Sequence, residues 1–195
     1  MRSAIACLPG LLLGLASAGC DRQKAVEPQA NRTAAAAPAA PAAAYPTGRL
    51  DRSHRGNAAP DLLFEDGQGR PVRLSAFRGR PVLVNLWATW CGPCVVEMPS
   101  LDALAARAGP ALEIVAISQD LAGRQKVSDF FAAHRFSRLE PYLDPEMRLM
   151  PALGLDTLPT TILYDSDGRE VWRMTGMAEW GDARTARLLL EADAG

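Results

Sequence analysis

A pair of cysteines enclosing a dipeptide is the part of this sequence whose residue types and spacing could do chemistry. Cys91 and Cys94 enclose Gly92 and Pro93, and Trp90 comes directly before them. Thiols at this spacing can close into a disulfide by giving up two electrons and reopen by taking them back. The bridge closes such a small ring that it constrains the unfolded chain little, so stabilisation explains it poorly. We therefore interpret Cys91 and Cys94 as a redox-active pair.

The pattern around the pair predicts where the thiols lie. Residues 82–87 form a nearly continuous apolar run, typical of a buried central strand, and residues 92–107 are expected to form a helix that Pro99 kinks. Cys91 would then stand at the helix N-terminus, where unpaired N–H groups and the helix dipole lower the pKa of a thiol. We expect Cys91 to attack a disulfide of the substrate and Cys94 to resolve the mixed disulfide.

Metal binding is the main alternative for a closely spaced cysteine pair. Zinc takes four ligands, and outside the pair the folded part of the chain offers only His134 and no second pair of cysteines. A copper carrier would need the pair together with His134 or a methionine. The methionines that could serve show no periodic clustering and are better explained as core residues: Met147, Met150, Met174 and Met177. We expect no metal site and no cofactor.

The remaining sequence patterns predict a mixed α/β domain. Apolar runs indicate strands at 112–118, 160–164 and 170–174, and an Asp-Gly turn indicates a hairpin over 64–72. Helical patterns cover 127–135, 145–153, where a proline would open the helix, and 183–192. Strands and helices in this order predict a mixed central sheet with helices on both of its faces, an α/β sandwich.

The N-terminal segment has the features of an export signal. Arg2 precedes an apolar run over 5–15, which is too short to span a membrane comfortably. The run ends in Ser17-Ala18-Gly19 before Cys20, which resembles the lipobox of bacterial lipoproteins, where the cysteine is lipidated and becomes the new N-terminus. Asp21 then resembles an inner-membrane retention signal. The alternative is ordinary signal cleavage of the A-x-A type, which would leave Cys20 as a free thiol.

We divide the chain into a signal peptide at 1–19, a tether at 20–57 and a folded domain at 58–195. The tether is rich in alanine and proline and holds almost no large apolar side chains, so we expect it to be disordered. Once the signal is removed and Cys20 is lipidated, the redox pair holds the only cysteines of the folded domain. The net charge of −1 indicates no basic face, so we expect no nucleic-acid partner.

The motif V-N-L-W-A-T-W-C-G-P-C-V-V-E-M-P at 84–99 resembles the TlpA/ResA-like thiol–disulfide oxidoreductases, the membrane-tethered reducing thioredoxins of bacterial envelopes. The resemblance extends over the whole domain and includes A-P-D-L at 59–62, L-S-A-F-R-G at 74–79 and L-P-T-T at 158–161. G-M-A-E-W at 176–180 is similar to the TlpA branch. The resemblance implies a thioredoxin-like three-layer sandwich with an N-terminal β-hairpin and a helical insertion around 145–153.

The resemblance also implies a substrate-binding surface around the pair. Pro159 looks like the cis-proline that faces the dithiol in this family, where the cis bond exposes the backbone of Leu158 to a substrate strand. The alternative is a proline that merely opens an edge strand. Trp90, Gly92 and Pro93 would complete the surface, with Trp90 shielding the dithiol and offering apolar contact to partners.

Glu97 matches the family's acidic residue and shares a helix face with Cys94. As a partly buried carboxylate with a raised pKa, it could move a proton to or from Cys94. Asn85 stands where ordinary thioredoxins carry a buried aspartate, which leaves Glu97 as the candidate proton acceptor. The alternative is an exposed acid in the first turn, favoured there by the helix dipole.

Taken together, these features predict a monomeric reductase of protein disulfides, anchored through Cys20 on the periplasmic side of the inner membrane. The candidate clients are apocytochrome c or a copper-site assembly factor of cytochrome oxidase, and electrons would come from a transmembrane thiol reductase. Two alternatives remain: a copper-binding metallochaperone of the same fold, and a general disulfide oxidant. The Gly92-Pro93 dipeptide disfavours the oxidant.

Overall fold

The computed structural model describes residues 47–193. The predicted signal peptide, Cys20 and most of the predicted tether lie outside the described residues. The described residues form one mixed sheet of eight strands in the order β1-β8-β7-β4-β5-β6-β2-β3. None of the helices in residues 47–193 is long and apolar enough to cross a membrane.

The centre of the sheet consists of the strands predicted from apolar runs. β4 (Val82–Trp87) is buried along its whole length, pairs in parallel with β5 (Glu113–Ser118) and pairs antiparallel with β7 (Thr160–Tyr164). β7 continues through a tight turn into β8 (Glu170–Thr175), which confirms the predicted hairpin. Strands covered on both faces read as continuous apolar runs, which is why they were visible in the sequence.

The first strand lies inside the segment predicted to be a disordered tether, so that boundary is wrong. β1 (Arg49–Asp51) pairs with the open edge of β8, with Leu50 opposite Met174. The N–H group of Gly48 also donates to the carbonyl of Met177 (2.7 Å). The strand is held by backbone hydrogen bonds and by the single apolar side chain of Leu50, which packs on the core. Composition alone does not reveal such a strand.

The opposite edge of the sheet is the predicted N-terminal hairpin. β2 (Leu63–Glu65) and β3 (Pro71–Arg73) pair antiparallel, and Glu65 lies opposite Leu143 of β6 (Tyr142–Leu143). β6 also pairs in parallel with β5, so the chain between them makes a crossover through a helix. The short strand β6 was not predicted, because two residues carry no periodic pattern.

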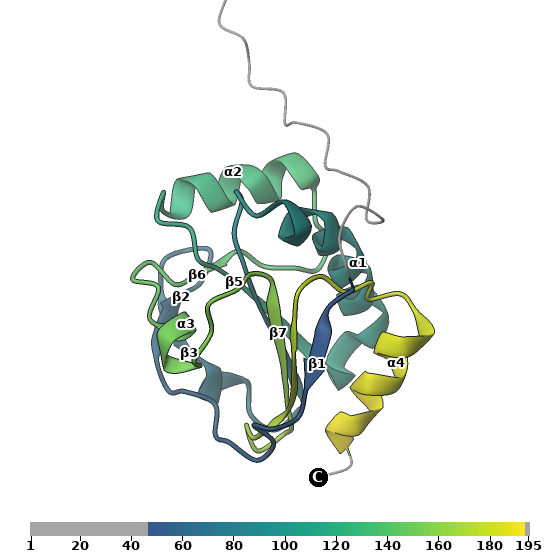
Figure 1. Ribbon diagram of the computed structural model, residues 1–195. Coiled ribbons are helices and arrows are strands. Elements are labelled where there is room, and N and C mark those ends of the chain that lie inside the picture. The colour runs from purple at the N-terminus through teal and green to yellow at the C-terminus, as the bar shows by residue number, and fades with distance from the viewer. Residues whose placement is uncertain (1–46, 194–195) are drawn as a thin grey trace, which may run out of the picture. The chain divides into compact units, whose positions relative to one another are not determined.

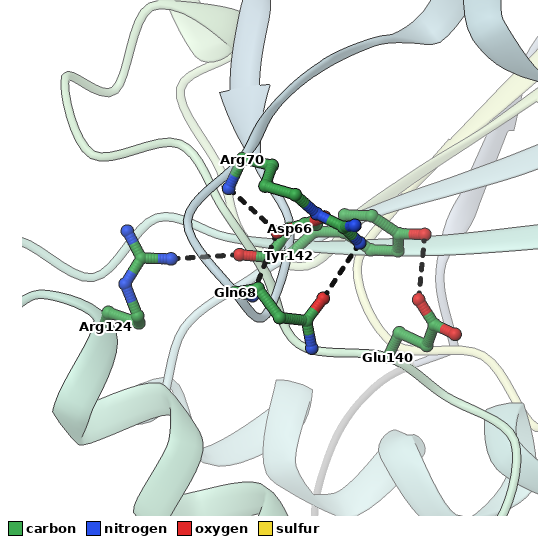
Figure 2. A network of polar contacts seen from close by, with 6 residues as sticks. All are labelled: Asp66, Gln68, Arg70, Arg124, Glu140 and Tyr142. Carbon is green, nitrogen blue, oxygen red and sulfur yellow. Dashed lines mark hydrogen bonds and ion pairs between the residues drawn. The ribbon is translucent and has the colours of Figure 1, made fainter.

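A polar network fixes the hairpin turn to that crossover (Figure 2). The carboxylate of Asp66 accepts hydrogen bonds from the N–H group of Arg70 (2.9 Å) and from its Nε atom (2.7 Å). Arg124, at the start of the crossover helix, donates to the carbonyl oxygen of Asp66 (3.0 Å). Near Asp66 and Arg70, the hydroxyl of Tyr142 donates to the carboxylate of Glu140 (3.2 Å). Arg124 therefore anchors the turn to the helix, while the hairpin meets β6 through the pairing of Glu65 with Leu143.

Helices cover both faces of the sheet, as the fold class requires (Figure 1). On one face, a core that includes Leu83 and Trp87 packs under α1 (Gly92–Ala108), α2 (Arg124–His134) and α4 (Ala183–Leu189). On the other face, Val84 and Leu86 pack with residues of α3 (Leu149–Ala152) and of the 3-10 turn at 74–77. Alternating side chains of one strand therefore serve two separate cores.

The helix predicted over 145–153 is shorter than expected. Only Leu149–Ala152 is helical, as α3. Met147 has a φ angle of +49°, in the left-handed region, so the chain cannot continue a right-handed helix through it. The larger helical segment between β5 and β7 is α2, which lies in the crossover.

Candidate active site

The cysteine pair lies where β4 ends and α1 begins, as predicted, and it is present as a disulfide between Cys91 and Cys94. Cys91 is the N-cap of α1, and its sulfur accepts a hydrogen bond from the N–H group of Cys94 (3.4 Å). Pro93 occupies the first turn, where the helix leaves N–H groups unpaired. These groups favour negative charge on the Cys91 sulfur.

The two cysteines differ in exposure. Cys91 is 6% exposed, whereas Cys94 is completely buried. An external disulfide can therefore reach only the Cys91 sulfur. This difference supports the predicted division between an attacking Cys91 and a resolving Cys94.

The residues predicted to bind substrate lie at the same end of the sheet. Trp90 is 68% exposed, directly before the disulfide. The peptide bond between Leu158 and Pro159 is cis. Because Thr160 lies opposite Leu86 in the sheet, this bond falls beside the end of β4, where the cysteines follow. Contact of these residues with a substrate stays a prediction.

Glu97 is a buried acid, so the alternative of an exposed surface residue is wrong. Its side chain is on the same face of α1 as Cys94 and is 2% exposed. Oε1 accepts a hydrogen bond from Nδ2 of Asn85 (2.7 Å), and Oε2 accepts one from the N–H group of Ala178 (2.9 Å). Burial raises the pKa of Glu97 to about 7, although both hydrogen bonds act to lower it. The carboxyl can therefore gain and lose a proton near neutral pH.

Asn85 connects this acid to the neighbouring strand. Besides Glu97, its Nδ2 group donates to Oγ1 of Thr161 on β7 (2.9 Å). Within residues 47–193, its Oδ1 atom has no hydrogen-bond partner although it is fully buried. The indole of Trp180 makes no hydrogen bond of ordinary geometry to the described residues, yet its proximity also lowers the pKa of Glu97.

The loop at 176–180 closes over this part of α1. Besides the Ala178 contact, the N–H group of Trp180 donates to Oγ of Ser100 (3.2 Å), and Arg107 donates to the Trp180 carbonyl (2.9 Å). Glu97, Ser100 and Arg107 follow one another along α1, so a single helix holds the loop. The sequence identified the loop only through its resemblance, and it did not predict that this loop buries Glu97.

Sequence reasoning also missed a buried carboxylate on the opposite side of the pair. Asp120 follows β5, is 1% exposed and accepts hydrogen bonds from Thr89, in the turn before Cys91. The available signal was the polar sequence Ser118-Gln119-Asp120, which begins at the last residue of a buried apolar strand. Such residues lie at the sheet end where the redox pair is.

Two of the side chains considered for copper binding, His134 and Met174, have other roles in the structure. Nδ1 of His134 is hydrogen-bonded to the carbonyl of Phe130 (2.8 Å), and the two rings stack with centroids 4.0 Å apart. Met174 is fully buried in the core that packs under α1, which agrees with the packing interpretation. In the part of the chain that the structure describes, no group of three or more His, Cys, Asp or Glu residues is arranged to hold a metal.

A thioredoxin-like sheet that carries a Cys-Gly-Pro-Cys disulfide at the start of a helix defines a class of thiol–disulfide exchange proteins. The model of the Redoxin family matches residues 54–189, so the chain belongs to this family. Thiol–disulfide oxidoreductase ResA of Geobacillus thermodenitrificans is 36% identical over 123 residues, covering 62% of this chain and 69% of the relative. ResA of Bacillus subtilis is 32% identical over 127 residues, covering 62% and 67%.

Solved structures show the same fold. A candidate thiol:disulfide interchange protein DsbE from Chlorobium tepidum is 25% identical with a TM-score of 0.63, over 71% of this chain and 96% of the other. The exposed lipoprotein thioredoxin Etrx1 of Streptococcus pneumoniae is 26% identical with a TM-score of 0.55, over 66% and 98%. The chain is therefore a thiol–disulfide oxidoreductase, and the resemblance to TlpA/ResA-like proteins is confirmed.

Proposed function

We propose that this protein is an envelope reductase that opens disulfides in apocytochrome c or in a copper-site assembly factor. The observation that carries this proposal is the buried, hydrogen-bonded Glu97, whose pKa is raised to about 7. A reductase must deprotonate the buried thiol of Cys94 in every cycle. Glu97, on the same helix face, is the group that we expect to accept this proton.

The reaction begins with the reduced pair. The Cys91 thiolate attacks one sulfur of the client disulfide, forms a mixed disulfide and releases the other client sulfur as a thiolate. Glu97, as a carboxylate, accepts the proton of Cys94, whose thiolate then attacks the Cys91 sulfur. This second step closes the Cys91–Cys94 disulfide and releases the second client sulfur as a thiolate, which takes up a proton from solvent, and it completes the transfer of two electrons to the client.

The client is held by the surface next to Cys91. Trp90 offers an exposed apolar face, and Gly92 has no side chain to block an approaching strand. The backbone of Leu158, before the cis-proline, offers hydrogen-bonding groups to an extended segment. An unfolded client with an accessible disulfide fits this surface better than a folded one.

The proposed location rests on the N-terminal sequence. A lipid on Cys20 would hold the domain at the periplasmic face of the inner membrane, and a transmembrane thiol reductase would return the electrons. The solved relative from Streptococcus pneumoniae is itself described as an exposed lipoprotein, which supports a tethered arrangement. Because β1 begins at Arg49, the tether would end before that residue.

An oxidised peptide with the haem-attachment sequence Cys-x-x-Cys-His provides the direct test. The reduced protein should reduce it, and Cys94→Ser should stop at the mixed disulfide, visible by mass spectrometry. Cys91→Ser is the matched control and should form no adduct, because Cys94 is buried. In cells, the wild-type pair should be found mainly reduced. A pair found mainly oxidised, or tight copper(I) binding without peptide reduction, would overturn the proposal in favour of an oxidant or a copper carrier.

A further inference from the structure

The carboxylate of Asp120 collects three side-chain and backbone donors from two segments. Oδ2 accepts from the N–H group of Thr89 (2.9 Å) and from Oγ of Ser118 (2.7 Å), and Oδ1 accepts from Oγ1 of Thr89 (2.6 Å). Its own N–H group donates to Oγ of Ser118 (3.1 Å). No arginine, lysine or histidine among residues 47–193 forms a salt bridge with it. A buried carboxylate without a cation depends entirely on such hydrogen bonds.

These bonds fix the turn that leads to the redox pair. The N–H group of Gln119 donates to the carbonyl of Trp87 (2.8 Å), which ties the start of the turn to the end of β5. The Thr89 contacts tie its middle to Asp120. The turn then closes through the N–H group of Cys91, which donates to the carbonyl of Ala88 (3.1 Å). The backbone just before Cys91 is thus attached to β5, while Cys94 is carried by α1.

We propose that Asp120 is a positioning residue for disulfide exchange, which holds the turn before Cys91 so that the two sulfurs stay within bonding reach. Closing the disulfide then orders fewer backbone torsions, since the turn is already fixed in the dithiol form. This pre-ordering favours the disulfide over the dithiol and makes the pair a stronger reductant. The proposal rests on exchange at the cysteine pair and is independent of the client and of Glu97.

The chain offers graded variants for a test. Asp120→Ala removes all acceptors at once, and Thr89→Val removes the hydroxyl donor alone at nearly constant shape. Asp120→Asn keeps one acceptor oxygen for the Thr89 N–H group, and its amide can donate to a hydroxyl that turns to accept. Asp167→Ala is the matched control, because Asp167 is exposed in the β7–β8 turn.

The measurement is the equilibrium constant of the full folded chain against a glutathione buffer series. Asp120→Ala should weaken disulfide formation about tenfold, which corresponds to a potential about 30 mV less negative. The equilibrium constants of Thr89→Val and Asp120→Asn should lie between those of Asp120→Ala and the wild type. The equilibrium constant of Asp167→Ala should equal that of the wild type.

A second measurement separates positioning from folding. Each variant is tested for a cooperative thermal unfolding transition. If Asp120 contributed to stability alone, its replacement would lower the midpoint temperature of unfolding without changing the equilibrium constant for disulfide formation. If Asp120→Ala does not fold, Thr89→Val provides the test by itself. Folded variants whose equilibrium constants all match the wild type would overturn the proposal. They would leave the peptide-reduction assay, and so the proposed function, unaffected.

Discussion

Replacing Glu97 with glutamine should remove a pH-dependent loss of stability. The pKa of this carboxyl is raised from 4.5 to about 7 because it is buried. Its folded state therefore keeps a proton that the unfolded chain has already lost. The resulting stability is fully present below pH 4.5 and is lost as the pH rises through about 7. The difference between the two pKa values corresponds to about 3 kcal/mol.

Glutamine keeps the shape of the side chain and cannot ionise. Its oxygen can accept from the N–H group of Ala178, and its amide can donate to Oδ1 of Asn85 after that side chain flips. The flip gives the wild-type Oδ1 atom, which has no partner among the described residues, a donor. It replaces the Nδ2–Thr161 hydrogen bond with one that the Thr161 hydroxyl donates to Oδ1, and it leaves Nδ2 as the amide atom without a partner. We therefore expect Glu97→Gln to be close to the wild type in stability at pH 4.5 and more stable by up to about 3 kcal/mol at pH 8.

Urea unfolding of the oxidised protein, measured from pH 4.5 to pH 8.5, is the assay for this change. Cys91 and Cys94 do not titrate while they form a disulfide. The contributions of the histidines to the pH dependence of unfolding cancel in the difference between the two proteins. The free-energy difference should rise with pH and level off above about pH 7.5. Parallel profiles would refute the reasoning, because they would mean that the Glu97 carboxyl titrates at its ordinary pKa. The helix face of Cys94 would then hold no acid that can take up a proton near neutral pH.

Three further predictions concern other parts of the molecule. Trp90→Ser should raise the KM for the oxidised peptide about tenfold with little change in unfolding free energy, since this side chain is 68% exposed; an unchanged KM would remove Trp90 from the binding surface. A chain beginning at residue 58 should be about 2 to 4 kcal/mol less stable to urea than one beginning at residue 47, because it lacks the β1–β8 hydrogen bonds and Leu50. The reduction potential should lie below about −220 mV, near the thioredoxin value of about −270 mV; a measured value above about −160 mV would identify an oxidant.

The sequence predicted the central strands and α1 because each has a local sequence pattern of its own. β4 is apolar on both faces except at Asn85, and the helix after it has Pro93 in its first turn, where a proline fits. β1 and β6 carry no such signal. Their pairing depends on backbone groups of β8 and β5 that are left open once the rest of the sheet has formed. Short edge strands follow from the completed sheet rather than from their own residues.

The residues of the site also differ in whether the local sequence could predict their surroundings. The local motif was sufficient to place Cys91 and Cys94 at a helix start and to place Glu97 on the same helix face as Cys94. It could not establish that Glu97 is buried, because the loop that covers it comes from 176–180, far along the chain. Asp120 likewise reaches Thr89, in the turn before the redox pair, only because β5 lies beside β4 and ends at the same edge. The sequence around the cysteines determines which sulfurs react. The proton affinity of Glu97 depends on the distant loop at 176–180, and the proposed positioning of the turn before Cys91 depends on Asp120 at the end of β5.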